Sequence, residues 1–403
     1  MVKILFLTFL ATLVNADPQL IALNRFSSIA PFDINGVEAG ARLYLASADD
    51  NSVLKNILIT TGANSITLDK LNDYNDDGTL KSIILVGNLQ ITTSNNDTTM
   101  ATVTGNLYIT TKTQADDPNF SVYVIKDQHY ISTNAMKSTV VVLNTGLSNS
   151  VEADAPSKTS YVSGMNQSPN TNIYFQWGIP ASNWYEVTNN TFFRNPVDFT
   201  NEGGMRTFFD NVEPLQINLD AWYFQVMGPN NIKIEKKYIS NKNYTVIAAK
   251  TTGLIMNSGI YQEHVVNFTP DMTKTGVSGI FYAAFGEYGT IGVYLKSATA
   301  GVSSVTNDTN NSKDEWSFFT NDQAYQLTVN TTLDKPGTFF AQYFTVPGED
   351  KPVTNPPVTV LPTTTLVPTE AGGVSTTTVG TSTKGSGCVF GWLIMVMMGV
   401  RLL

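Results

Sequence analysis

The chain has 403 residues, of which 42% are hydrophobic, and its formal net charge is −9. This length is enough for two ordinary domains with sizeable cores. No basic run could neutralise phosphates, so the acidic balance excludes nucleic acid as a partner.

The N-terminal end has the pattern of a secretory signal peptide. Lys3 gives a short basic start, an apolar run extends from Ile4 to Val14, and Ala16 precedes the polar Asp17. The run is too short to cross a bilayer, and Val14 and Ala16 are compact residues suited to a cleavage site. We predict that residues 1–16 are removed and that the mature chain starts at Asp17.

The C-terminal end has the pattern of a glycosylphosphatidylinositol (GPI) anchor signal. A cluster of small residues is followed by a polar spacer, Ser375–Gly387, and by an apolar tail, residues 388–403. The candidate attachment residues are Ala371, Gly372 and Gly373. The pattern predicts a protein on the extracellular face of the plasma membrane, held to the outer leaflet through a lipid anchor.

A single transmembrane helix is the alternative for this tail. Its sixteen residues fall short of the ~20 that cross a bilayer, and Arg401 interrupts them. A second cluster of small residues, Ser386–Cys388, leaves almost no spacer and is a weaker attachment site.

Anchor attachment would also remove Cys388, the only cysteine of the chain. The mature ectodomain would then contain no disulfide, so apolar cores alone must hold each domain. Its sequons predict heavy N-glycosylation on loops and exposed strand faces, because a bulky enzyme must reach each acceptor. The nine acceptors are Asn96, Asn119, Asn166, Asn189, Asn243, Asn267, Asn307, Asn310 and Asn330.

Short apolar runs with a period of two, bounded by Gly, Asn or Asp, predict β-strands. In the first half they cover residues 42–46, 53–60, 82–92, 100–111 and 120–125. The second half is richer in aromatic residues, in runs at 173–177, 222–224, 280–282 and 339–344. The similar segments 56–61, 87–93 and 105–111 favour neighbouring strands that share one buried face.

The predicted fold class is all-β, with two consecutive antiparallel β-sandwich units and a disordered Thr/Pro-rich stalk. The break between the units is placed where Pro, Gly and Ser cluster without apolar periodicity. The predicted parts are a first sandwich at 17–150, a linker at 151–172, a second sandwich at 173–346, a stalk and spacer at 347–387, and the tail.

One turn has the spacing of a calcium loop. Asp73, Asn75 and Asp77 place oxygens at alternate positions before Gly78, which permits a sharp turn. The position of the bidentate glutamate of an EF-hand is taken by Ile84, and an ordinary Asp/Asn turn is the alternative. Ca²⁺ is the one cofactor that the sequence suggests.

Catalytic motifs are absent from the sequence. His129 and His264 are the only histidines, and no nucleophile elbow, zinc motif or ectodomain cysteine accompanies them. A glycosidase needs only two carboxylates, and the sequence neither nominates nor excludes such a pair. We therefore expect no enzymatic activity and keep a surface hydrolase as the third hypothesis.

The aromatic runs suggest two uses. Rings fall on both faces of residues 339–344, as in a strand covered on both sides. Trp177 and Trp184 flank a turn-like segment, and they are the candidate glycan contacts, since flat rings stack on pyranose faces.

The strand-ending runs Asn119–Val124 and Thr338–Pro347, within this order of parts, resemble nematode secreted and surface proteins with CUB-like domains. The resemblance implies a jelly-roll sandwich and surface recognition, often in responses to microbes. CUB-like domains usually carry cysteines, which this ectodomain lacks.

Together these patterns predict a GPI-anchored, N-glycosylated surface protein that recognises a glycan or protein ligand or protects the cell, with a role in innate defence implied by the resemblance. The alternative is a carbohydrate-binding, lectin-like module.

Overall fold

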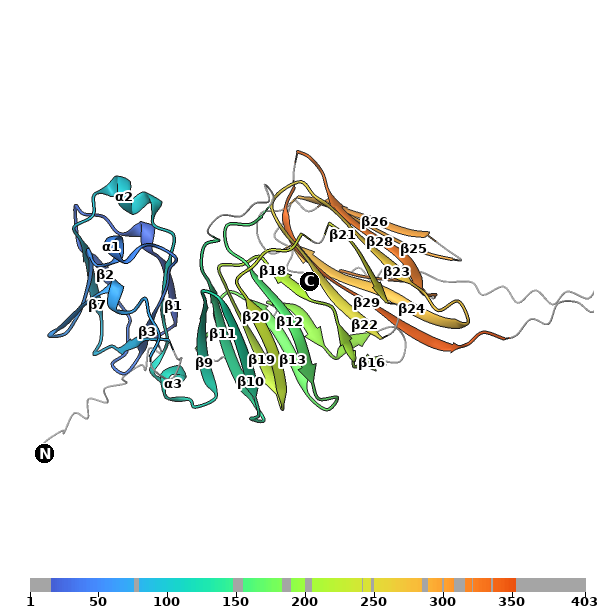
Figure 1. Ribbon diagram of the computed structural model, residues 1–403, viewed down its shortest axis with the longest axis horizontal. Helices are drawn as coiled ribbons and strands as arrows, with labels where there is room; N and C mark the ends of the chain where they lie inside the picture. Colours follow the sequence, from blue (N-terminus) through green and yellow to red (C-terminus); the bar gives the residue numbers. More distant parts are fainter. Residues whose placement is uncertain are drawn as a thin grey trace, which may run out of the picture. The chain divides into compact units, whose positions relative to one another are not determined.

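The computed structural model (Figure 1) describes most of the chain before the predicted stalk. The described residues are 16–75, 80–147, 155–182, 190–199, 205–240, 242–247, 250–284, 289–298, 301–307, 316–320, 322–334 and 336–352. The predicted signal peptide up to residue 15, most of the stalk, the anchor signal and the apolar tail therefore lie outside the described residues.

The N-terminal part forms two four-stranded sheets around one core. Its elements are β1 (Gln19–Ala22), η1 (Leu23–Arg25), β2 (Phe32–Ile34), β3 (Arg42–Ala46), α1 (Asn51–Leu54), β4 (Ile57–Thr61), β5 (Asn64–Thr67), η2 (Leu68–Lys70), β6 (Ser82–Ile84), β7 (Leu89–Thr93), α2 (Asp97–Thr102), β8 (Asn106–Ile109) and α3 (Lys112–Asp116). The strand orders are β1-β8-β3-β6 and β2-β7-β4-β5. Alternate residues, such as Leu43 and Leu45 of β3, fill the core between the sheets.

The middle part is a second pair of sheets with an aromatic core. Its strands are β9 (Phe120–Ile125), β10 (Gln128–Thr133), β11 (Ser138–Asn144), β12 (Ser160–Gln167), β13 (Asn172–Trp177), β14 (Thr191–Asn195), β18 (Leu215–Ile217), β19 (Ala221–Met227) and β20 (Asn230–Glu235), and β15 (Val197–Phe199) and β16 (Met205–Thr207) form a separate hairpin. The strand orders are β14-β13-β19-β11-β9 and β10-β20-β12-β18. Trp222 and Phe175, with ring centroids 5.1 Å apart, lie in the core between them.

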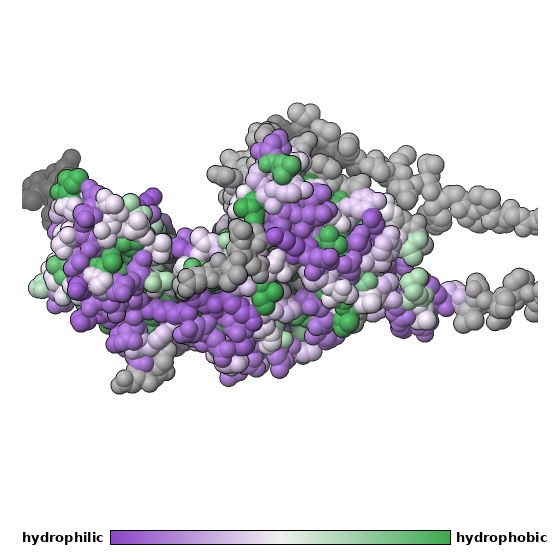
Figure 2. Space-filling view, turned by 45° about the horizontal axis from the view of Figure 1, so that its top comes forward, coloured by the Kyte–Doolittle hydropathy of each residue, from purple (hydrophilic) through white to green (hydrophobic). Residues whose placement is uncertain are grey.

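The C-terminal part is a third pair. Its strands are β17 (Asn211–Val212), β21 (Asn243–Ile247), β22 (Thr251–Ser258), β23 (Glu263–Thr269), β24 (Lys274–Ala284), β25 (Thr290–Ser297), β26 (Gly301–Asn307), β27 (Trp316–Thr320), β28 (Ala324–Thr331) and β29 (Thr338–Asp350). The strand orders are β17-β22-β29-β24-β27 and β21-β23-β28-β25-β26. The second of these sheets comes forward in the space-filling view, where its surface is mostly hydrophilic (Figure 2).

The expected aromatic strand at residues 339–344 is confirmed as the centre of β29. Phe339 and Tyr343 enter the core of the third sheet pair, whereas Phe340 packs into the core of the second pair and Phe344 joins a further buried cluster. The sheet that contains β29 is therefore covered on both faces, which explains why its sequence shows no alternation of polar and apolar residues.

The all-β class is confirmed, since the described α-helices have at most six residues. The arrangement differs from the predicted two units, because the described sheets form three pairs, each around its own core. The segment predicted as a linker, 151–172, includes β12, which pairs with β18 and β20. Pro, Gly and Ser mark turns around this strand, and β11 before it and β13 after it both pair with β19.

Among the strands that the structure describes, three pairings are parallel, where the sequence predicted an antiparallel fold. They join β9 to β11, β21 to β23, and β17 to β22. In the first two cases the intervening strand, β10 or β22, lies in the facing sheet. The chain crosses to the other sheet and returns, so the two flanking strands run in the same direction.

Two predicted strands begin as helices. Asp50 caps α1 by accepting from the backbone N–H of Ser52 at 2.6 Å. Asn96 caps α2 by accepting from the backbone N–H of Thr99 at 2.8 Å. Caps of this kind satisfy backbone donors that a strand would not expose, and they overcome the β-propensity of the residues that follow.

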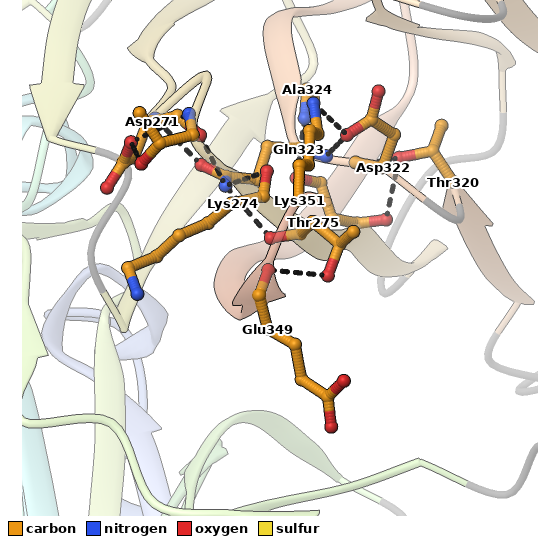
Figure 3. Close-up of polar contacts among 11 residues, drawn as sticks. Asp271, Lys274, Thr275, Thr320, Asp322, Gln323, Ala324, Glu349 and Lys351 are labelled. Atoms are coloured by element: carbon orange, nitrogen blue, oxygen red, sulfur yellow. Dashed lines mark hydrogen bonds and ion pairs between the residues drawn. The ribbon is translucent and has the colours of Figure 1, made fainter. Parts of the chain in front are cut away.

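A buried glutamine, Gln323, connects the residues before β28 to residues 271–275 near the end of β29 (Figure 3). The side-chain amide of Gln323 donates to the carbonyl oxygens of Asp271, Lys274 and Thr275 at 3.0, 3.2 and 3.0 Å, and its oxygen accepts from the N–H of Asp271 at 3.0 Å. A Cβ on Gly276 would lie 2.5 Å from Cγ of Gln323, so only glycine leaves room for this side chain without a shift.

Polar contacts in the same region link the last described residues to β24. Lys351 donates its backbone N–H to the carbonyl of Thr273 at 2.7 Å, and Lys274 forms an ion pair with Asp350 at 2.8 Å. The hydroxyl of Thr275 donates to the carbonyl of Glu349 at 3.1 Å. Several polar contacts therefore tie the last described residues to the neighbouring strand.

Candidate functional site

A cleft of about 460 Å³ opens where the first and second sheet pairs meet. The two sheets that flank it, β1-β8-β3-β6 and β14-β13-β19-β11-β9, share a buried cluster that includes Tyr108, Val141 and Tyr223. The cleft is lined by Arg42, Tyr44, Tyr74, Asn75, Leu80, Ser82, Phe120, Ser121, Val122, Tyr123, Val124, His129 and Tyr130. These residues come from β3, β6, β9, β10 and the turn before β6.

Four of the residues that line the cleft are tyrosines. Tyr44 is stacked on the buried Tyr108, with ring centroids 6.3 Å apart, which fixes its ring. Tyr74 and Tyr123 are half-buried, whereas Tyr130 is 71% exposed and lies at the rim. Aromatic rings with hydroxyl groups offer both an apolar face and a hydrogen-bonding tip to a ligand.

His129 is held in place at the wall of the cleft. Its Nε2 lies 3.2 Å from the carbonyl oxygen of Val124, which also accepts a hydrogen bond from the Tyr74 hydroxyl at 3.2 Å. The ring of Tyr123 meets His129 edge-on at 5.6 Å. Burial lowers the pKa of His129, so the imidazole is neutral at physiological pH.

Arg42 supplies the fixed positive charge of the cleft. Its Nη1 donates to the hydroxyl of Ser82 at 3.1 Å, so the guanidinium is oriented by a neutral partner. Guanidinium groups present several donors in one plane, which suits a ligand with neighbouring oxygen atoms. The cleft thus combines flat rings with a planar donor group.

The predicted calcium turn lies beside this cleft. Asp73 forms an ion pair with Lys81 at 2.7 Å, and hydrogen bonding to Lys81 lowers the pKa of its carboxyl group. Asn75 lines the cleft, and Asp77 lies outside the described residues. Tyr74 and Leu80 form a β-bridge, as expected for a turn. No group of three metal-binding side chains occurs in the described part of the chain, and Ca²⁺ binding stays a prediction.

The other candidate residues lie elsewhere. Trp177 is half-buried and packs against Phe340, with ring centroids 5.7 Å apart, so its ring belongs mainly to the core. Trp184 and the anchor candidates at 371–373 lie outside the described residues. His264 is buried on the core side of β23, away from solvent.

A smaller pocket contains a half-buried carboxyl group. Its volume is about 140 Å³, and Glu213, Tyr161 and Tyr244 are among its lining residues. Burial raises the pKa of Glu213, and the Tyr244 hydroxyl donates to that of Tyr343 at 2.9 Å. The tyrosine cleft is larger than this pocket. The sequence did not indicate the cleft because its residues come from separate segments.

The fold is all-β, and tyrosines line a cleft between its first two sheet pairs. The chain belongs to the transmembrane glycoprotein family, because the model of that family matches residues 38–400. No curated protein matches the sequence. Among the described residues, no helix has the length and apolar character needed to cross a membrane.

Two solved structures show a distant similarity. One is the mosquito-larvicidal Cry4Aa toxin from Bacillus thuringiensis, with 8% identity over 83% of this chain and a TM-score of 0.18. This chain spans 58% of the length of the toxin chain. The other is an archaeal virus protein with a triple jelly-roll fold, with 10% identity, coverage of 79% of this chain and 83% of that chain, and a TM-score of 0.13. TM-scores this low establish no shared fold.

Proposed function

We propose that this protein is a non-enzymatic surface glycoprotein that recognises a ligand in the cleft lined by Tyr44, Tyr74, Tyr123 and Tyr130. Membership of a membrane glycoprotein family supports the location, and the cleft is the observation that carries the recognition role. The role in defence against microbes and the relation to CUB-like proteins remain proposals that rest on the resemblance alone.

The chemistry of the cleft favours a carbohydrate ligand. A pyranose ring has an apolar face that can stack on tyrosine and a rim of hydroxyl groups that can accept from Arg42 and exchange hydrogen bonds with the tyrosine hydroxyls. A pocket of this kind usually combines apolar walls with a few placed polar groups. We therefore propose this cleft, rather than Trp177 and Trp184, as the carbohydrate-binding site.

The ligand can be tested by applying the ectodomain to a glycan array. We expect retention of a subset of glycans, and the Tyr130→Ala variant should bind them about two- to tenfold more weakly, the range typical of one ring contact. Tyr130 is 71% exposed, so the fold should tolerate its loss.

The matched control is Tyr325→Ala, which removes another exposed tyrosine, on β28. Retention of no glycan by the wild-type protein, or equal binding by the wild type and Tyr130→Ala, would contradict the carbohydrate site.

We further propose that a GPI anchor attached at Ala371, Gly372 or Gly373 holds the protein to the outer leaflet. The order of small residues, spacer and apolar tail supports this attachment. The family model extends over most of the tail, to residue 400, and its description is a transmembrane glycoprotein, so a membrane span of the tail is the alternative to the anchor.

Phosphatidylinositol-specific phospholipase C should release the protein from expressing cells, and the released chain should end within residues 371–373. A chemical-cleavage control covers an acylated anchor that resists the enzyme. Recovery of a peptide from residues 388–403 in the membrane fraction would instead identify a transmembrane span.

A further inference from the structure

The sheet β21-β23-β28-β25-β26 has one buried and one solvent-facing side. On β23, His264, Val266 and Phe268 are buried, and on β28, Leu327 and Val329 are buried. The residues between them are exposed or half-buried. Because side chains alternate along a strand, these intervening residues form a continuous outer face.

Three predicted glycosylation acceptors lie on this one face. Asn243 on β21 and Asn330 on β28 are exposed, and Asn267 on β23 is half-buried. Each is followed by the threonine that its sequon requires. A fourth acceptor, Asn307, ends β26 at the edge of the same sheet, where it pairs with Thr290. An N-linked glycan is bulky and hydrophilic, so occupied sites here would cover the face.

Asn330 has an unusual position in the sheet. It stands opposite Gly292 on β25, and a Cβ on Gly292 would lie only 2.3 Å from Oδ1 of Asn330. The missing side chain therefore lets the asparagine lie over β25. Glycine at the centre of a strand costs stability, and close approach of another group is a usual reason for it.

An exposed aromatic ring lies next to this position. Tyr294 is two residues beyond Gly292 on β25, and it pairs with Thr328. Such a diagonal neighbour is about 7–8 Å from Asn330 between backbone positions. Tyr294 is 39% exposed, and Nζ of Lys296 lies 4.9 Å from the centre of its ring. The hydroxyl end of the Tyr294 ring points toward Gly301 on β26, where an added Cβ would lie 3.2 Å from the hydroxyl oxygen. A sugar on Asn330 would therefore meet the ring from the side of Gly292.

The other two acceptors lie side by side. Nδ2 of Asn267 donates to Oδ1 of Asn243 at 3.0 Å, and Oδ1 of Asn267 accepts from Gln326 at 3.1 Å. An N-linked side-chain amide keeps one N–H, so this bonding is compatible with a glycan on either asparagine. Asn267 pairs with Gln326 on β28. Gln326 lies four residues before Asn330, so the two acceptor positions are separated by about 13 Å along the strand direction.

We propose that the outer face of this sheet is covered by the protein's own N-glycans, and that the innermost sugar on Asn330 packs over Gly292 against Tyr294. The occupant is a covalently attached sugar, so the exposed tyrosine on this face is a glycan contact rather than a docking site for another protein. Ligand recognition then belongs to other faces of the molecule. The proposal does not depend on what the cleft binds.

The test combines glycopeptide mass spectrometry with nitration of exposed tyrosines by tetranitromethane. We expect glycans on Asn243, Asn267 and Asn330 and slow nitration of Tyr294. In Asn330→Gln, nitration of Tyr294 should rise about two- to tenfold, the range set by the loss of one ring contact. Asn166→Gln removes an exposed acceptor on β12, in another sheet, and should leave Tyr294 unchanged.

A second variant separates the sugar contact from the presence of the glycan. Gly292→Val should keep Asn330 glycosylated but displace its side chain, so nitration of Tyr294 should rise while the glycopeptide mass stays the same. An unoccupied Asn330, or equal nitration of Tyr294 in the wild type and Asn330→Gln, would overturn the proposal.

Discussion

Replacing Trp222 with alanine is expected to lower the free energy of unfolding by about 3–5 kcal/mol, as for other large core residues. The side chain is fully buried in the second sheet pair and packs on Phe175 and Phe192. Its indole N–H donates to the hydroxyl of Ser160 at 3.1 Å, so the substitution also leaves a buried hydroxyl with one partner fewer. Urea unfolding followed by circular dichroism measures the loss.

The matched comparison is Trp177→Ala. This tryptophan packs against the same core but is only half-buried, so its loss should cost clearly less. An equal effect of the two substitutions would contradict the assignment of Trp222 to the centre of the core.

Replacing Gln323 with leucine is expected to cost about 3 kcal/mol or more, since a buried polar group without its partner costs about 1–3 kcal/mol. Leucine is similar in size to glutamine, but the substitution removes one accepted and three donated hydrogen bonds. Gln323 is 3% exposed, so water cannot readily replace these bonds. The urea midpoint should fall.

Gln326→Leu, on β28 three residues after Gln323, provides the control. Gln326 is half-buried, and its contacts are to Asn267 and Lys296 side chains at the outer face, so its loss should cost about 1 kcal/mol or less. If both variants unfold at the same urea concentration, the buried network contributes no more to stability than a surface pair.

Alternation in the sequence predicted several strands well. The predicted bounds of β3 and β9 match the structure, and each aromatic run of the second half lies within a strand. Two of the three similar segments, 56–61 and 87–93, are neighbouring strands as predicted, because β4 and β7 pair directly. The third similar segment, β8, lies in the facing sheet instead. Alternation identifies the buried side of a strand, but it does not identify the strand's partner.

The number of sheet pairs could not be predicted for the same reason. Pairings such as that of β9 with β11, across β10 in the other sheet, depend on the path of the chain through space. The helices α1 and α2 were missed because single capping residues, Asp50 and Asn96, decide them locally.

The cleft was missed because no single segment contains it. Tyr44 and Arg42 are the outward-facing residues of a strand whose inward residues fill a core, and such tyrosines are common in sandwiches. Tyr74 lies in the turn before β6 of the same sheet pair, and Tyr123, on β9, joins them only where the second sheet pair meets the first. The sequence analysis proposed Trp177 and Trp184 because of their large rings. In the structure, Trp177 packs against the core of the second sheet pair.

The length and position of β29 have a mechanical consequence. This strand of 13 residues lies between β22 and β24, and its neighbours run antiparallel along it. A pull on the chain beyond Pro352 would act along the strand, so it would strain both ladders of hydrogen bonds at once in shear, rather than open them one bond at a time. The contacts of Lys351 and Asp350 with the start of β24 would meet that force first.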